Sequence, residues 1–208
     1  MLSRCLRGGI RLILTLFVGT TAFAASAPVT VLLDFEQPGS SSALPALTAE
    51  LHRLLSRADI QVDIQVKNSF AEHAEFKDVV LVKMKGRCSM ESLSVAALSG
   101  ERGPLAMTYS VDGNVLPFAD VNCDRVRTSV QRASGRANAA QHQAEYGIAL
   151  ARVMAHELYH ILAKSSTHTR AGITKQALSS TELTERNFDF SLRALESFHR
   201  AEATAAKP

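Results

Sequence analysis

HELYH, at residues 156–160, is the stretch of sequence around which the rest of the chain is organised. On an α-helix, positions i and i+4 lie one turn apart on the same face, so His156 and His160 can both point at one metal ion. Glu157 is rotated by about a quarter-turn from that pair, close enough to reach a water at the metal but not placed as a ligand. Two imidazoles that hold an ion and a carboxylate that takes a proton from water are the parts of a zinc hydrolase site.

The residues around HELYH predict that its helix is buried. Residues 147–155 are almost entirely apolar, and Leu158, Ile161 and Leu162 continue the apolar surface beyond the first histidine. The alternative is a surface helix that carries two histidines and an acid by chance. Histidine and glutamate side chains on a buried helix need polar partners, and a metal with its water supplies them. The setting therefore favours the metal site.

The N-terminus has the pattern of a secretory signal peptide. Arg4, Arg7 and Arg11 precede an apolar run at 12–23, and small residues follow, so cleavage is expected after Ala24. A signal anchor is the alternative, but the run is short for a membrane span. The sequence thus predicts a secreted or periplasmic protein with no stable membrane insertion after cleavage.

The charge of the chain gives no sign of nucleic-acid binding. The formal net charge is +3, and the signal peptide carries three arginines and no acid, so residues 25–208 are close to neutral. We expect these residues to form a single domain, since their length suits one sizeable core. The sequence does not determine the oligomeric state.

Two cysteines follow the signal peptide, Cys88 and Cys123. In an oxidising compartment an even pair predicts one disulfide bond. The alternative is two unpaired thiols. The context of these cysteines has no spacing typical of a zinc site.

Hydrophobic periodicity predicts an α+β domain, in which strands and one helix come first and further helices follow. Strands are expected at 29–35, 59–66 and 78–84, a looser strand or loop at 92–97, and a hairpin with arms at 105–111 and 115–121 around Asp112-Gly113-Asn114. Helices are expected at 44–57, 124–132 and 139–164, with a last helix from about Ser191. This order predicts a mixed or antiparallel twisted sheet, a long helix that bears the site, and C-terminal helices.

A catalytic zinc usually has three protein ligands, and two residues compete for the third position. His168 lies eight residues past His160, just beyond the expected end of the helix, so a tight turn could bring it back to the metal. Glu182 lies further along, at a distance suited to a ligand from a second helix, although a glutamate after Ser and Thr is also an ordinary helix start. Glu185 or water is a further option. The other histidines are expected to be solvated: His52, His73, His142 and His199.

At these residues the chain resembles the zincin metallopeptidases. One branch, the metzincins, has HExxHxxGxxH and a later methionine turn; another, the gluzincins, takes a glutamate about twenty residues on. Neither pattern fits fully: seven residues separate His160 from His168 where metzincins have five, Ala163 stands at their glycine, and no methionine follows Met154. The methionine turn therefore does not carry over.

The chain is most similar to uncharacterised bacterial zincin-like, or metzincin-like, proteins with HExxH and a later His-x-x-x-Gly-Ile. Here that context runs from His168 to Ile173, with Thr174 where a methionine is common, and the similarity is specific only over 147–173. The resemblance implies a zincin fold, one catalytic zinc ion and His168 as the third ligand.

Two functions are compatible with these residues. The first is a secreted zinc metallopeptidase that acts on peptide or protein substrates, with Glu157 as the general base. The second is a zincin-fold binding or scaffold protein that cleaves nothing, which the missing methionine turn suggests. The presence of Glu157 favours the peptidase, because a purely structural zinc site has no use for a base.

Overall fold

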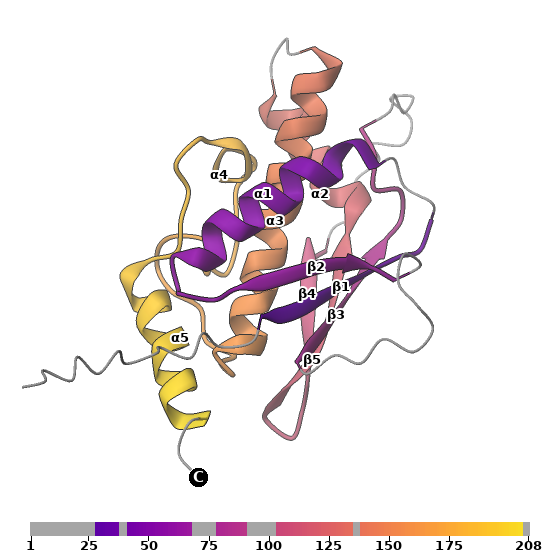
Figure 1. Ribbon diagram of the computed structural model, residues 1–208. Helices are drawn as coiled ribbons and strands as arrows, with labels where there is room; N and C mark the ends of the chain where they lie inside the picture. Colours follow the sequence, from indigo (N-terminus) through magenta and orange to yellow (C-terminus); the bar gives the residue numbers. More distant parts are fainter. Residues whose placement is uncertain (1–27, 38–40, 68–77, 91–102, 135–137, 206–208) are drawn as a thin grey trace, which may run out of the picture.

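The computed structural model describes residues 28–37, 41–67, 78–90, 103–134 and 138–205 (Figure 1). The expected signal peptide at 1–24 and the expected strand or loop at 92–97 lie outside these ranges. The strands are β1 (Val29–Phe35), β2 (Val62–Val66), β3 (Val79–Lys85), β4 (Ala106–Val111) and β5 (Asn114–Asn122). The helices are a 3-10 turn η1 (Ser41–Ala43), α1 (Leu44–Ser56), α2 (Cys123–Ala133), α3 (Ala139–Leu162), α4 (Ser180–Thr184) and α5 (Leu192–Ala205).

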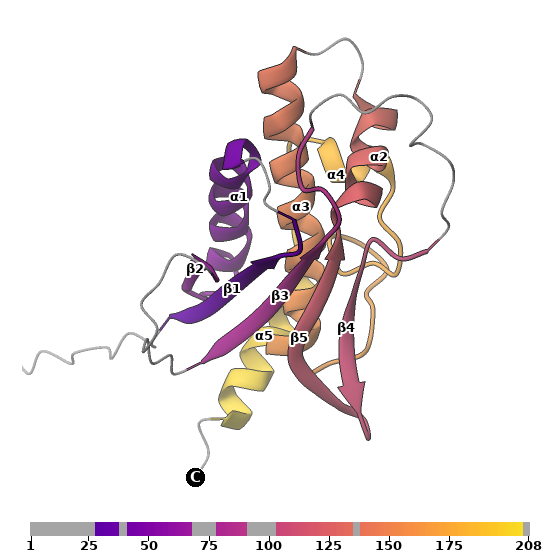
Figure 2. The same cartoon turned by 90° about the vertical axis from the view of Figure 1, so that its right-hand side faces the viewer.

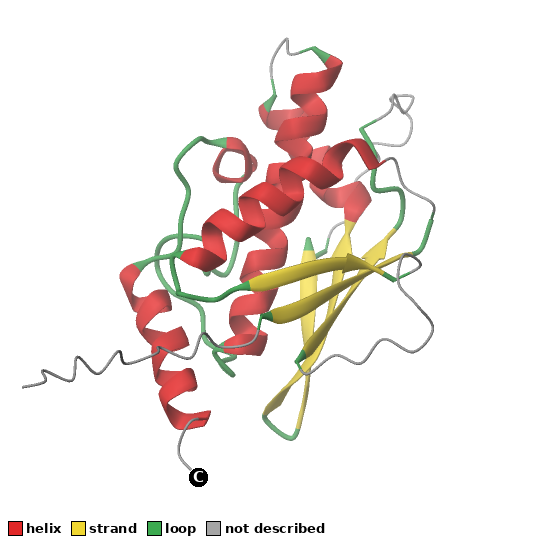
Figure 3. Ribbon diagram, viewed as in Figure 1, coloured by secondary structure: helices red, strands yellow, loops and turns green. Residues whose placement is uncertain are grey.

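The five strands form one mixed sheet in the order β2-β1-β3-β5-β4. The pairs β1–β2, β1–β3 and β3–β5 are parallel, and only β4–β5 is antiparallel. Parallel neighbours need a crossover, which α1 supplies between β1 and β2, whereas β4 and β5 meet through a two-residue turn at Asp112 and Gly113, both with positive φ. The predicted α+β organisation with a mixed sheet, a long helix and C-terminal helices is confirmed (Figures 2 and 3).

The second strand begins later than the alternation of its residues suggests. The sequence predicts a strand from Asp59, but β2 starts at Val62 because the chain is still closing the end of α1. Asp59 lies in the left-handed region (φ 57°), and the Ile60 amide donates to the Leu55 carbonyl at 3.1 Å. Aspartate tolerates this conformation, so the turn takes the first residues of the expected strand.

The core lies between the sheet and α3, and the burial predicted for this helix is confirmed. Every residue from 149 to 161 is buried. Gly147 allows the close approach of α1, since a Cβ there would lie 2.4 Å from the Ala43 carbonyl oxygen. Lys164, in the left-handed region at φ 47°, turns the chain back after the helix ends. No helix in the described ranges is both long and apolar enough to cross a membrane.

Cys88 and Cys123 form a disulfide bond, as predicted. The bond joins the segment after β3 to the first residue of α2, across a sequence separation of 35 residues. Both side chains are buried in the core cluster. The link therefore fixes the start of α2 against the sheet.

Replacing both cysteines by serine should lower the free energy of unfolding by about 3–4 kcal/mol, because the open chain gains the entropy that closure of a loop of this length removes. Urea denaturation of the double variant and the wild type measures the difference. Alkylation of wild-type protein purified without reductant, followed by intact-mass measurement, is the control. Two alkylated thiols in that sample would contradict the bond.

Candidate metal centre

His156 and His160 lie one turn apart on the buried part of α3. The helix begins with a capping box between Asn138 and Gln141, and both histidines lie in its last two turns. Their side chains point the same way, with the two Nε2 atoms 3.2 Å apart. The spacing of four residues thus brings two ring nitrogens to one point, as the sequence predicts.

The other ring nitrogen of each histidine contacts a backbone carbonyl. His156 Nδ1 lies 2.8 Å from the Ile173 oxygen, and His160 Nδ1 lies 2.6 Å from the Ser165 oxygen. A carbonyl oxygen only accepts, so each Nδ1 carries the proton and donates it. In a neutral imidazole this leaves the Nε2 lone pair free. Such carbonyl partners are typical of histidines that ligate metals.

Burial keeps both imidazoles in the neutral form. It lowers the pKa of His156 and of His160 below the ordinary value for histidine, and the hydrogen bonds to the two carbonyls offset only part of that effect. Two neutral rings then point lone pairs at each other across 3.2 Å. That contact is repulsive unless a cation lies between them.

His168 joins the pair from the segment after α3. Its ring centroid lies 5.1 Å from that of His156 and 4.8 Å from that of His160. One ligand nitrogen from each of the three histidines lies within 4.8 Å of the other two. His168 is exposed whereas the helical pair is buried, so the cluster opens to solvent on the His168 side.

Glu157 lies beside the histidines and is itself buried, with 6% of its surface exposed. Its Oε2 accepts a hydrogen bond of 2.6 Å from the Thr108 hydroxyl on β4. Burial raises the pKa of the Glu157 carboxyl, and the Thr108 hydrogen bond acts in the opposite direction. A glutamate with a raised pKa is better matched to proton transfer near neutral pH than a solvated one.

The residues present fit a zinc ion. Three imidazoles are a common ligand set of catalytic zinc, and the two buried Nε2 atoms, 3.2 Å apart, converge on one point. A ligand set closed by a fourth protein side chain would instead indicate a structural site. Within the described residues, only these three side chains form a group able to hold a metal.

Glu182 and Glu185, the alternative third ligands, lie elsewhere. Glu182 belongs to the capping box of α4, where its carboxylate accepts from the Ser179 amide at 2.9 Å, and it also pairs with Lys175. Glu185 is exposed at the end of the same short helix. Glu182 is therefore a residue of a helix start, which is the alternative interpretation of its sequence context.

The Ile173 carbonyl that holds His156 is itself fixed by the chain before α5. The Ile173 amide donates to the Asp189 carbonyl at 3.1 Å, and Asp189 Oδ1 accepts from Arg53 on α1 at 2.7 Å. Gly172 permits this approach: its φ is +76°, and a Cβ there would lie 2.6 Å from the Asp189 oxygen. Position 172 thus has room only for glycine.

Three partners of the site were missed by sequence reasoning: Thr108 and the carbonyls of Ser165 and Ile173. Nothing in the sequence marks a carbonyl as a partner, because every residue carries one. Thr108 lies on a hairpin arm that the sequence predicts, but its distance of 49 positions from Glu157 gives no local signal. Tyr159 is buried, and its ring packs against that of Phe198 on α5 at 5.4 Å between centroids.

Comparison with known proteins gives few matches. No protein-family model matches the chain, and no curated protein does. Among solved structures, the chain is similar to the crystal structure of archaemetzincin from Methanopyrus kandleri. The similarity covers 85% of this chain and 96% of that one, at 12% sequence identity and a TM-score of 0.49. The candidate metal centre therefore stands on its own geometry.

Gly172→Ala should reduce both stability and zinc affinity. Alanine in the left-handed region costs about 1–2 kcal/mol, and its Cβ would push the Asp189 backbone away from the Ile173 segment. Displacing the carbonyl partner of a ligand should weaken zinc binding by about 10–100-fold. Chelator competition and urea denaturation measure the two effects.

Gly113→Ala is the matched control, since Gly113 has nearly the same φ, +78°, but no atom lies within 4 Å of a Cβ built there. This variant should lose stability from backbone strain alone and keep the zinc affinity of the wild type. Equal zinc affinity in the two variants would contradict the role of Gly172.

Glu182→Gln should change the pH dependence of stability and leave metal content unchanged. The hydrogen bond from Lys175 is the largest cause that lowers the pKa of Glu182, to about 2. A carboxylate with a lowered pKa stabilises the fold above its unfolded pKa, and that stability disappears as pH falls from about 4.5 toward 2. Unfolding curves of both proteins should therefore differ at pH 6 and converge at low pH. Loss of zinc from the variant would instead place Glu182 among the ligands.

Proposed function

We propose that the protein is a secreted zinc-dependent metallopeptidase of the zincin type. The observation that carries the proposal is the convergence of two buried Nε2 atoms, 3.2 Å apart, with His168 completing the cluster and Glu157 beside it. Bound zinc would polarise the scissile carbonyl and lower the pKa of the attacking water. His156, His160 and His168 would hold the ion.

Glu157 acts as the general base. Its carboxylate lies next to the first ligand in sequence, and its Oε2 is fixed by Thr108 at 2.6 Å. It takes a proton from the attacking water and later delivers a proton to the leaving amine. The raised pKa that burial gives this carboxyl suits both steps, because a stronger base accepts the proton and the protonated form then donates it.

The edge strand β4 supplies a place for an extended peptide. Within the described residues it pairs with β5 alone, and it carries Thr108 next to Glu157. A peptide that adds to this edge through backbone hydrogen bonds lies along the strand whose Thr108 contacts Glu157. Backbone pairing does not depend on the side chains of the peptide. Pairing with β4 therefore suits any unfolded peptide or protein segment.

The second candidate function is a zincin-fold binding or scaffold protein that holds zinc without cleavage. No methionine follows Met154, so the methionine turn of the metzincins is missing from this chain. Its absence suggests a protein that binds zinc without cleaving peptides. Purified wild-type protein that contains zinc and leaves every member of a diverse peptide library intact would favour this function.

The ligand and base variants should separate into two groups. His156→Ala and His168→Ala each leave two imidazoles, so zinc affinity should fall by more than the roughly 10–100-fold expected for loss of an outer partner. Glu157→Gln should keep zinc and lose peptide cleavage, because its carboxylate acts on water rather than on the ion. Mass-spectrometric metal analysis after dialysis, alongside cleavage of a peptide library, measures both properties.

His52→Ala is the control, since His52 is exposed on α1 and belongs to no metal cluster in the described ranges. It should match the wild type in zinc and turnover. Wild-type protein without zinc, or unchanged cleavage in Glu157→Gln, would overturn the proposed function. Zinc kept in His168→Ala but lost in Glu182→Ala would move the third ligand to Glu182.

A further inference from the structure

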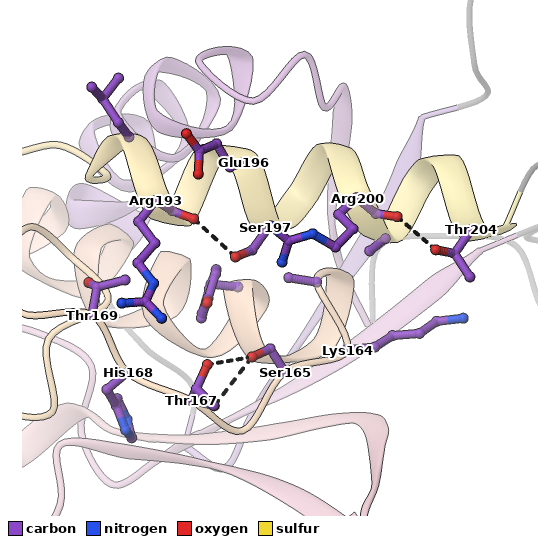
Figure 4. A pocket seen from close by; sticks show the side chains of 14 residues that line it. Lys164, Ser165, Thr167, His168, Thr169, Arg193, Glu196, Ser197, Arg200 and Thr204 are labelled. Carbon is purple, nitrogen blue, oxygen red and sulfur yellow. Dashed lines mark hydrogen bonds between the residues drawn. The ribbon is translucent and has the colours of Figure 1, made fainter.

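A groove with a volume of about 810 Å³ lies between α5 and the segment 163–169 (Figure 4). We call it the α5 groove. His168 is among the residues that line it, so the groove borders the candidate metal centre. Its volume is in the range of pockets that hold small ligands, enough for one or two amino-acid side chains.

The α5 wall of the groove is one face of the helix. Arg193, Ser197, Arg200 and Thr204 recur at intervals of three or four residues and all line the groove. The neighbouring stripe of the helix is buried, and there the Phe198 ring packs against Tyr159 of α3 at 5.4 Å between centroids. This packing fixes the arginine-bearing face relative to the metal centre.

The charges around the α5 groove are mostly positive. Lys164, Arg193 and Arg200 line it, and Glu196 is its single acidic residue. In Figure 4, Arg193 extends from α5 toward Thr169, and Glu196 lies along the upper edge of the helix. In the part of the chain that the structure describes, none of the three cations forms an ion pair.

We propose that the α5 groove binds a carboxylate of the peptide substrate and so gives the site a preference for acidic peptides. This proposal rests on the proposed function, since it assigns a preference to the same site. A guanidinium presents a planar fork that matches a carboxylate and binds it with two parallel hydrogen bonds. The hydroxyls of Ser165 and Thr167 bond each other at 2.9 Å, which leaves one O–H of the pair to donate to a carboxylate. The carboxylate belongs either to an Asp or Glu side chain or to the peptide C-terminus.

The test measures peptide binding to the full-length Glu157→Gln protein by isothermal titration calorimetry, so that the peptides stay intact. The reference is a neutral hexapeptide with an amidated C-terminus. One arm places Glu at each position of this peptide in turn, and the other arm leaves the neutral peptide with a free C-terminal carboxylate. At least one peptide in one arm should bind about tenfold more tightly than the reference, as expected for a charge-assisted bidentate contact. The arm in which this occurs identifies the source of the carboxylate.

The preference should disappear when Arg193→Gln and Arg200→Gln are combined in this background, and Lys164→Gln alone should reduce it. Arg186→Gln, an exposed arginine outside the groove, is the matched control and should keep it. No preference for either arm, no binding of any acidic peptide, or a preference that survives the double substitution would overturn the proposal. Cleavage by the wild type is scored separately, so binding without cleavage rejects the proposed function and leaves the groove's role intact.

Discussion

The burial of α3 is the constraint on which the rest of the structure depends, because this core helix carries charged and polar side chains that each need a partner. Arg152, only 1% exposed, donates to Glu50 on α1 at 2.9 Å and to the Glu182 carbonyl at 3.0 Å. Glu157 accepts from Thr108. His156 and His160 donate to carbonyls through Nδ1. Once these bonds are assigned, the two Nε2 lone pairs are left facing each other, and a cation is the partner that satisfies both.

The need of buried polar side chains for partners also links the core to the candidate metal centre. Arg53 bonds Glu50 on its own helix and Asp189 before α5, both at 2.7 Å, and Glu50 is also the partner of Arg152. Asp189 then holds Ile173, whose carbonyl orients His156. Of these pairs, the Arg152–Glu50 pair is buried, and removing one partner of a buried pair typically costs about 3–5 kcal/mol. Residues of α1, far from the histidines in sequence, therefore help to set the orientation of His156.

The candidate metal centre has a different kind of surface on each side. On one side, β4 offers the free backbone groups of an edge strand, which bind extended chains regardless of their side chains. On the other, the α5 groove offers arginine and lysine side chains, which distinguish charged from neutral groups. In the proposed function, backbone recognition would therefore lie on the β4 side, beside Glu157, and side-chain preference on the α5 side, beside His168.

The sequence by itself determined the local features: the helix with His156 and His160 on one face, the hairpin turn at Asp112-Gly113, and the cysteine pair. These depend on residue spacing and on the conformations that single residues allow, so they can be inferred without knowledge of distant contacts. Only the tertiary structure decided that His168 rather than Glu182 lies with the helical pair, that Thr108 contacts Glu157, and that two carbonyls hold the imidazoles. These outcomes depend on how segments far apart in the chain pack together, and hydrophobic periodicity marks which face of a segment is buried but not which distant segment it contacts.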